Sequence, residues 1–131
     1  DKFVESFMNK IRKIPDFYNV KFIILYGSRA IGKENSMSDY DFAIYYEGNK
    51  KERFNFLINA NFDKKFDVKI FQDLPIYIRK EVFKGKIIYA KELDFVYDIA
   101  YKTIKEFEMF KKYYYDYIKR RAVVKWLRRM N

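Results

Sequence analysis

Residues 20–41 read VKFIILYGSRAIGKENSMSDYD, and this stretch decides the fold class. It opens with an apolar run over 20–26 that is typical of a buried strand and that ends at a glycine. A Gly-Ser pair at 27–28 follows, and ten residues separate this pair from the Asp-Tyr-Asp run at 39–41. The spacing predicts a strand, a turn suited to phosphate, and two carboxylates at the start of a second strand.

The remaining chain alternates helical and extended patterns, which predicts an α/β (α+β) domain with a small mixed sheet and flanking helices. We expect Phe54, Leu57 and Ile58 to form the buried stripe of the third helix, and Gly85 to cap the fourth. Expected helices cover 2–13, 28–33, 51–60, 75–85 and about 92 onward, with a break near Lys119; expected strands cover 20–26, 41–46, 66–71 and 87–90.

Composition removes most competing chemistries. The chain has no Cys and no His, which excludes disulfides, thiolate metal sites, Ser-His-Asp triads and nearly all zinc enzymes. Catalysis must therefore rely on carboxylates, hydroxyls, Lys or Arg. Oxygen ligands without nitrogen or sulfur favour Mg²⁺, with Mn²⁺ as the alternative.

Length and charge bound the organisation of the chain. Its 131 residues fit one domain, with a core over about 1–92 and a helical extension over about 93–131. The net charge is +10, and eight basic residues against one acid lie between Lys111 and Arg129. This tail could attract nucleic acid, ATP or an acidic protein. Neither a signal peptide nor a run of about 18 apolar residues is visible, which favours a cytoplasmic protein.

The carboxylates carry the predicted chemistry. Asp39 and Asp41 are two apart and therefore project from one face of a strand, where each raises the pKa of the other. A divalent cation relieves this repulsion, and two such ions can hold the attacking and leaving oxygens of a displacement at phosphorus. Asp67 is the predicted third carboxylate because it alternates with the apolar face of its strand. Asp63 is the competitor, but it lies in the preceding turn.

The turn after the first strand is the predicted nucleotide-binding site. Gly27 lets the backbone approach a phosphate, and Ser28 can donate to a phosphate oxygen at the start of a short helix. Arg29 and Lys33 lie beside this turn and could neutralise triphosphate charge.

Two stretches carry a family resemblance. Residues 27–32 (GSRAIG) and 38–44 (SDYDFAI) resemble the minimal nucleotidyltransferases of the DNA polymerase β superfamily. The resemblance covers roughly residues 5–92, and the C-terminal helix more loosely. Ile31 and Tyr40 depart from the usual pattern; Ile31 removes a phosphate contact, and Tyr40 is expected to pack away from the carboxylates.

The resemblance implies a polymerase β-type fold and a specific reaction. Asp39 and Asp41 would bind two Mg²⁺ ions, and Asp67 would bind the catalytic ion and help deprotonate an acceptor hydroxyl. Gly27 and Ser28 would hold the β- and γ-phosphates of ATP. Such proteins are often antitoxins paired with a HEPN-domain ribonuclease toxin, and they transfer AMP to a tyrosine of that partner.

Two other functions remain open. The chain could neutralise a HEPN toxin by contact alone, with Lys111–Arg129 and the tyrosines at 113–115 as contact surface. Alternatively, the acceptor could be a small molecule or an RNA end. The tyrosine cluster could instead pack on the chain's own core.

Overall fold

The computed structural model describes residues 1–27 and 39–130 of the chain. Within these residues one sheet contains the strands β1 (Val20–Tyr26), β2 (Tyr40–Tyr46), β3 (Phe66–Ile70) and β4 (Lys86–Ala90). Their order across the sheet is β3-β2-β1-β4; β2 and β3 run parallel, whereas β1 pairs antiparallel with both β2 and β4. The prediction of a small mixed sheet is confirmed.

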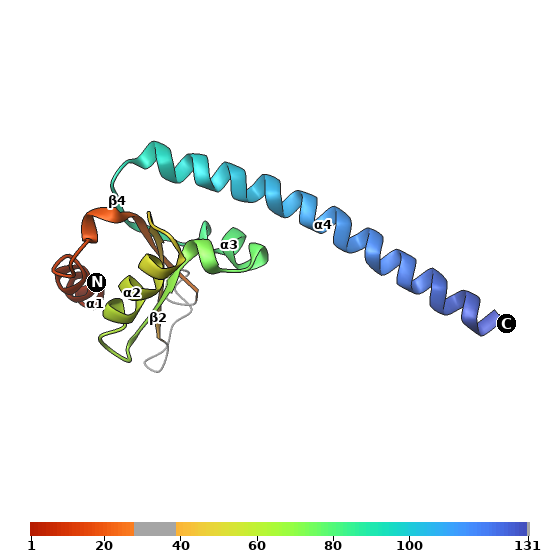
Figure 1. The fold of residues 1–131 in the computed structure, drawn as a ribbon, viewed down its shortest axis with the longest axis horizontal. Coiled ribbons are helices and arrows are strands. Elements are labelled where there is room, and N and C mark those ends of the chain that lie inside the picture. Colours follow the sequence, from red (N-terminus) through yellow and green to blue (C-terminus); the bar gives the residue numbers. More distant parts are fainter. Residues whose placement is uncertain (28–38, 131) are drawn as a thin grey trace.

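Helices cover both faces of this sheet. They are α1 (Lys2–Ile11), α2 (Lys50–Ala60), α3 (Ile76–Val82) and α4 (Leu93–Met130), with short 3-10 turns at Phe17–Asn19 and Phe71–Asp73. Residues of α1 and α2 pack against one face, and residues of α3 and the beginning of α4 pack against the other. Figure 1 shows α4 passing α3 and continuing away from the rest of the protein to the C-terminus.

The face under α1 and α2 holds an aromatic core. Phe7 of α1 stacks on Phe42 of β2 with ring centroids 3.9 Å apart, and Phe66 of β3 meets both rings edge-on. Tyr40 is 2% exposed on this face, and its hydroxyl donates to the Asp1 carboxylate at 2.7 Å. Tyr40 therefore packs on the α1 side, opposite the face that Asp41 takes, as predicted from the strand alternation.

The buried stripe predicted for α2 is only partly correct: Leu57 packs against the core, but Phe54 and Ile58 do not belong to it. Phe54 and Ile58 are 60% and 59% exposed, whereas Phe56 is buried and stacks on Tyr46 with centroids 4.6 Å apart. A helical stripe can contain either Phe54 or Phe56, so periodicity alone does not decide which of the two is buried. Phe56 and Ala60 lie in the core under α2, and Arg53 bonds the Asp73 carboxylate at 2.8 Å beside them.

Two further expectations are corrected at the ends of helices. α3 has its C-cap at Phe83, two residues before Gly85. A Cβ at Gly85 would collide with the backbone carbonyl of Leu25, so glycine is needed there for the close approach of β1. α4 is continuous through Lys119, without the expected break.

The helix predicted over 28–33 lies outside the described residues. Within residues 1–27 and 39–130, none of the helices combines the length and the apolar character needed to cross a membrane.

Candidate active site

The candidate site is a row of three side chains that crosses three neighbouring strands. Tyr26 of β1 is the register partner of Asp41 of β2, and Asp41 is the register partner of Asp67 of β3. Cross-strand partners on one face have Cβ atoms about 5 Å apart. The sheet therefore places Asp41 and Asp67 side by side although 25 residues separate them in the sequence.

Strand alternation fixes which face the row occupies. Asp41 lies between the buried Tyr40 and Phe42, which point toward α1 and α2. Asp67 lies between the buried Phe66 and Val68 in the same way. Both carboxylates therefore project to the opposite face, where α3 and α4 pack, and both are half-buried there.

Burial and like charge make Asp41 unusual. Partial burial is the main cause that raises the pKa of its carboxyl to about 6; the charge of Asp67 and a hydrogen bond to it add to the shift, and Asp39 contributes least. Lys69 opposes the shift and bonds the Asp67 carboxylate at 3.1 Å. Burial also raises the pKa of the Tyr26 phenol to about 12, with the charges of Asp41 and Asp67 as further causes.

Gly27 closes the row at the end of β1. Its φ of +77° lies in the left-handed region that glycine tolerates best. A Cβ at this position would lie 2.6 Å from Oδ2 of Asp41. The positive φ is the reason that glycine is favoured here, and a larger residue would also push the Asp41 carboxylate aside, which the sequence did not reveal.

The other predicted site residues are only partly placed. Asp39 is exposed and immediately precedes β2. Ser28, Arg29 and Lys33 lie outside the described residues, so their phosphate contacts stay predictions. Among residues 1–27 and 39–130, no three carboxylates are gathered closely enough to hold a metal ion. The structure brings Asp41 and Asp67 together, and the three-carboxylate cluster with Asp39 stays a prediction.

The donor set fits a hard divalent cation. Asp41 and Asp67 offer only oxygen ligands, which Mg²⁺ and Mn²⁺ prefer. Without a cation, two neighbouring carboxylates in a half-buried position disfavour double ionisation, as the raised pKa of Asp41 indicates. The residues present therefore fit such an ion, with Asp41 and Asp67 as ligands and Asp39 adjacent in the sequence.

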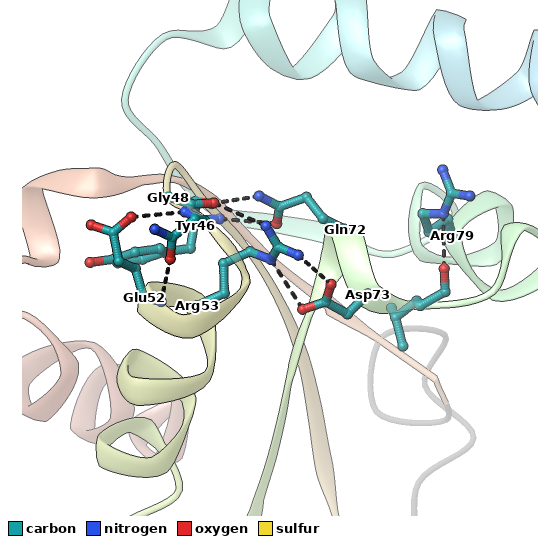
Figure 2. Close-up of polar contacts among 9 residues, drawn as sticks. Tyr46, Gly48, Glu52, Arg53, Gln72, Asp73 and Arg79 are labelled. Carbon is teal, nitrogen blue, oxygen red and sulfur yellow. Dashed lines mark hydrogen bonds and ion pairs between the residues drawn. The ribbon is translucent and has the colours of Figure 1, made fainter.

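The Gln72 side chain extends the strand pairing that aligns the two carboxylates. Every β2–β3 partner pair differs by 26 residues, from Tyr40 with Phe66 to Ile44 with Ile70. Beyond Ile70 the backbone leaves the sheet, but the Gln72 side chain pairs with Tyr46, which is again 26 residues earlier. The amide oxygen of Gln72 accepts from Tyr46 N at 3.2 Å, and its Nε2 donates to Tyr46 O (Figure 2). The side chain thus replaces one residue of the parallel ladder.

This extra pair matters because alternation does not fix the register completely. A slip by one residue would bury Asp67, but a slip by two residues would keep Phe66 and Val68 on the apolar face. Such a slip would take Asp67 away from Asp41. Gln72 opposes it, supported by the ion pair between Arg53 and Asp73 that holds the turn after β3 (Figure 2).

Three contributing residues were missed in the sequence. Tyr26 reads as the end of an apolar strand, and Gln72 as an ordinary polar residue after one. Of these three, only Lys69 could have been recognised from the sequence, because it stands two residues from Asp67 and therefore lies on the same face of the strand.

A mixed sheet that pairs two carboxylates beside a glycine turn is the arrangement expected of a nucleotide-transfer domain. The chain belongs to the family described as polymerase beta, nucleotidyltransferase, whose profile matches residues 9–94. A protein of Methanocaldococcus jannaschii, described as a candidate protein adenylyltransferase, is 36% identical over 74 residues. That match spans 55% of this chain and 57% of the relative, little more than half of each.

Solved structures confirm the polymerase β-type fold. A chain in the crystal structure of a toxin–antitoxin with AMP-PNP has a TM-score of 0.63 at 20% identity, over 92% of this chain and 95% of that one. A chain in the complex of tri-AMPylated Shewanella oneidensis HEPN toxin with MNT antitoxin has a TM-score of 0.58 at 18% identity, over 95% of each. At these identities the likeness establishes the fold alone.

Proposed function

We propose that this protein is an antitoxin that transfers AMP from ATP to a hydroxyl, preferably a tyrosine, of a partner HEPN-domain toxin. The observation that carries the proposal is the register pairing of Asp41 with Asp67 beside Gly27. Membership of the nucleotidyltransferase family supports the reaction type. Similarity to chains of toxin–antitoxin complexes, one with AMP-PNP and one with an AMPylated HEPN toxin, supports the donor and the partner.

Each predicted residue has a role in this reaction. Gly27 and Ser28 hold the β- and γ-phosphates, and Arg29 and Lys33 neutralise triphosphate charge. The acceptor oxygen forms a bond to the α-phosphorus while the bond from that phosphorus to the bridging oxygen breaks and pyrophosphate leaves. Asp67 accepts the hydroxyl proton. We place the core of this single nucleotidyltransferase domain at about 1–92 and its helical extension at about 93–131.

Mg²⁺ is the proposed metal, with Asp39, Asp41 and Asp67 as ligands. When bound, two ions would neutralise the charge that develops on the attacking and leaving oxygens. Asp41 contributes a carboxylate whose ionisation is costly in the free protein. Lys69 forms an ion pair with the Asp67 carboxylate at 3.1 Å and holds it on the strand face that Asp41 shares.

A labelling experiment tests the proposal. The protein is incubated with α-labelled ATP, Mg²⁺ and the purified HEPN-domain partner, and label on the partner is measured. We expect Asp39→Ala, Asp41→Ala and Asp67→Ala each to abolish labelling. Asp63→Ala is the matched control, because this carboxylate lies on the same segment but bonds the backbone N–H of Lys65 in a turn. Labelling that survives EDTA would overturn the metal mechanism.

A second function has its own supporting observation. The last turns of α4 are exposed and extend away from the body (Figure 1), so a partner could be held by contact alone. A partner that stays unlabelled, yet is neutralised by the Asp39→Ala/Asp41→Ala double variant, would establish this function in place of AMP transfer. Transfer to a small molecule or to an RNA end is the remaining alternative, and the same assay with those acceptors tests it.

A further inference from the structure

The outer part of α4 is a helix without a supporting layer. We call residues 108–130 the arm; all of them are exposed. Its 23 residues extend for about 35 Å at 1.5 Å per residue. Figure 1 shows the arm running clear of the sheet and of α3. Tyrosines, valines, a leucine and a tryptophan on it are 47–66% exposed.

One face of the arm continues the face that holds α4 to the body. Val96 and Thr103 are buried against the body, and Phe107 is half-buried with Lys80 of α3 4.4 Å from its ring centroid. The same face at helical spacing then carries a set of side chains that we call the arm stripe: Phe110, Tyr114, Tyr117, Arg121, Val124 and Arg128.

The arm stripe is ordered by its own contacts. Phe110 lies 6.3 Å from Phe107 between ring centroids, and Tyr114 stacks on Phe110 at 5.9 Å. Arg121 donates to the Tyr117 hydroxyl at 3.1 Å. A shallow hollow on the arm is lined by Tyr117, Arg121, Val124 and Arg128, among other residues. A row of three neighbouring aromatic rings, Phe107, Phe110 and Tyr114, therefore leads from the α3–α4 contact out along the arm.

The composition of the arm stripe is that of a protein–protein interface core. Aromatic residues and Arg are enriched in such cores, whereas Lys is depleted. The arm stripe contains three aromatics and two arginines and no lysine. Lys112 and Lys119 lie on the opposite face of the helix.

Charge selects the kind of partner. Between Lys111 and Arg129 the chain carries eight basic residues and one acid. Two such helices side by side would repel each other, which disfavours a second copy of this chain. RNA would satisfy the charge, but it offers nothing to cover Val124, Leu127 and the other aliphatic side chains that are exposed on the arm.

We propose that the arm stripe is the docking site for the partner protein, through a groove on that protein with an apolar floor and acidic rims. The inference rests on the proposed function for the identity of the partner, a HEPN-domain protein. The arm stripe continues the side of α4 that faces the sheet, and Asp41 and Asp67 project from that same face of the sheet. A protein on the arm stripe is therefore held on the side of the molecule where its hydroxyl must react.

Two matched double variants test the docking site by calorimetric titration with the purified HEPN-domain protein. Arg121→Glu/Arg128→Glu changes the arm stripe, and Lys112→Glu/Lys119→Glu makes the same charge change at the same spacing on the opposite face. We expect Kd to rise at least thirtyfold for the first variant and less than threefold for the second. Tyr114→Ser, which keeps the charge, should raise Kd about tenfold, and far-UV circular dichroism checks that α4 remains helical.

Each other outcome has a defined meaning. Equal effects of the two double variants, or no binding by the wild type, would overturn the docking site. A stripe-dependent affinity for a single-stranded 20-nucleotide RNA without one for the protein would assign the arm to RNA instead. Dimerisation in sedimentation that Tyr114→Ser abolishes would assign it to a second copy.

The same samples test the proposed function separately from the docking site. Wild-type protein that binds its partner in an arm-stripe-dependent way but transfers no AMP would overturn AMP transfer and keep the docking site. AMP transfer at partner concentrations below Kd that is unchanged in Arg121→Glu/Arg128→Glu would overturn the docking site and keep AMP transfer.

Discussion

The body of the protein and its arm use similar residues in opposite ways. In the body, aromatic rings such as Phe7 and Phe42 are buried against each other across two layers. In the arm, Tyr113 and Trp126 are 66% and 58% exposed on the part of α4 that extends away from the body (Figure 1). Within the described residues, every buried side-chain polar atom has a hydrogen-bond partner. The difference teaches that the body is complete in itself, whereas the arm has the composition of a surface that a second molecule covers.

The largest expected difference between the two regions is in activity. Asp41→Asn should lower AMP transfer at least a thousandfold, because it removes one of the two register-paired carboxylates. Asp116→Asn makes the same change on the arm and should leave the transfer rate within threefold. Initial rates with α-labelled ATP measure both. Equal rates for wild type and Asp41→Asn would contradict the assignment of the site.

Truncation of an aromatic side chain should lower the stability of the protein much more in the body than in the arm. Phe7→Ala should lower the free energy of unfolding by about 3–5 kcal/mol, because Phe7 is fully buried and stacked on Phe42. Tyr115→Ala on the arm should change it by less than about 0.5 kcal/mol. Urea unfolding followed by circular dichroism measures both values. A loss above about 1 kcal/mol for Tyr115→Ala would show that the arm packs on the body.

Acid should weaken metal binding at the body site. The pKa of Asp41 is about 6, so its ionised form is lost as pH falls through that value. We expect the affinity for Mg²⁺ to fall about tenfold from pH 7 to pH 5. Titration calorimetry with Mg²⁺ alone measures this change, and the same fall in Asp41→Asn would assign it to another group.

The same pKa predicts an opposite effect on the stability of the metal-free protein. Because the pKa is raised in the folded state, the stability from Asp41 is fully present below about pH 4 and is lost as pH rises through 6. Solvent screening of this half-buried group reduces the effect to about 1 kcal/mol. In EDTA at pH 8, Asp41→Asn should therefore raise Tm by about 3 °C. An unchanged Tm would contradict the raised pKa.

The last expected effect concerns the register of β3. Gln72→Ala removes two hydrogen bonds to the backbone of Tyr46 and should lower the free energy of unfolding by about 1–2 kcal/mol. Amide hydrogen exchange should speed up selectively in β2 and β3. On the arm, Arg121→Ala removes one exposed hydrogen bond to Tyr117 and should cost less than about 0.5 kcal/mol. Uniform exchange in Gln72→Ala would contradict its role in strand pairing.

Much of the fold could be predicted from local patterns. The apolar run 20–26 ends at a glycine, and β1 has those bounds. Alternation around Asp67 predicted its face. The pKa of Asp41 is raised mainly by burial and then by Asp67, whereas Asp39, the neighbour from which the repulsion was predicted, contributes least. For α2 the pattern predicted Leu57 correctly but not Phe56, because periodicity allows both Phe54 and Phe56, and the stacking of Phe56 on Tyr46 is a tertiary contact.

The sequence by itself determined the chemistry that is available, because residue types set it: oxygen ligands without His or Cys, and a glycine turn before paired aspartates. Only the tertiary structure decided which carboxylates meet, because strand register joins residues that are remote in sequence. It also decided that the end of α4 has no layer against it, because burial depends on neighbours from other elements. Residue type fixed which chemistry is available, and packing fixed which of these residues meet.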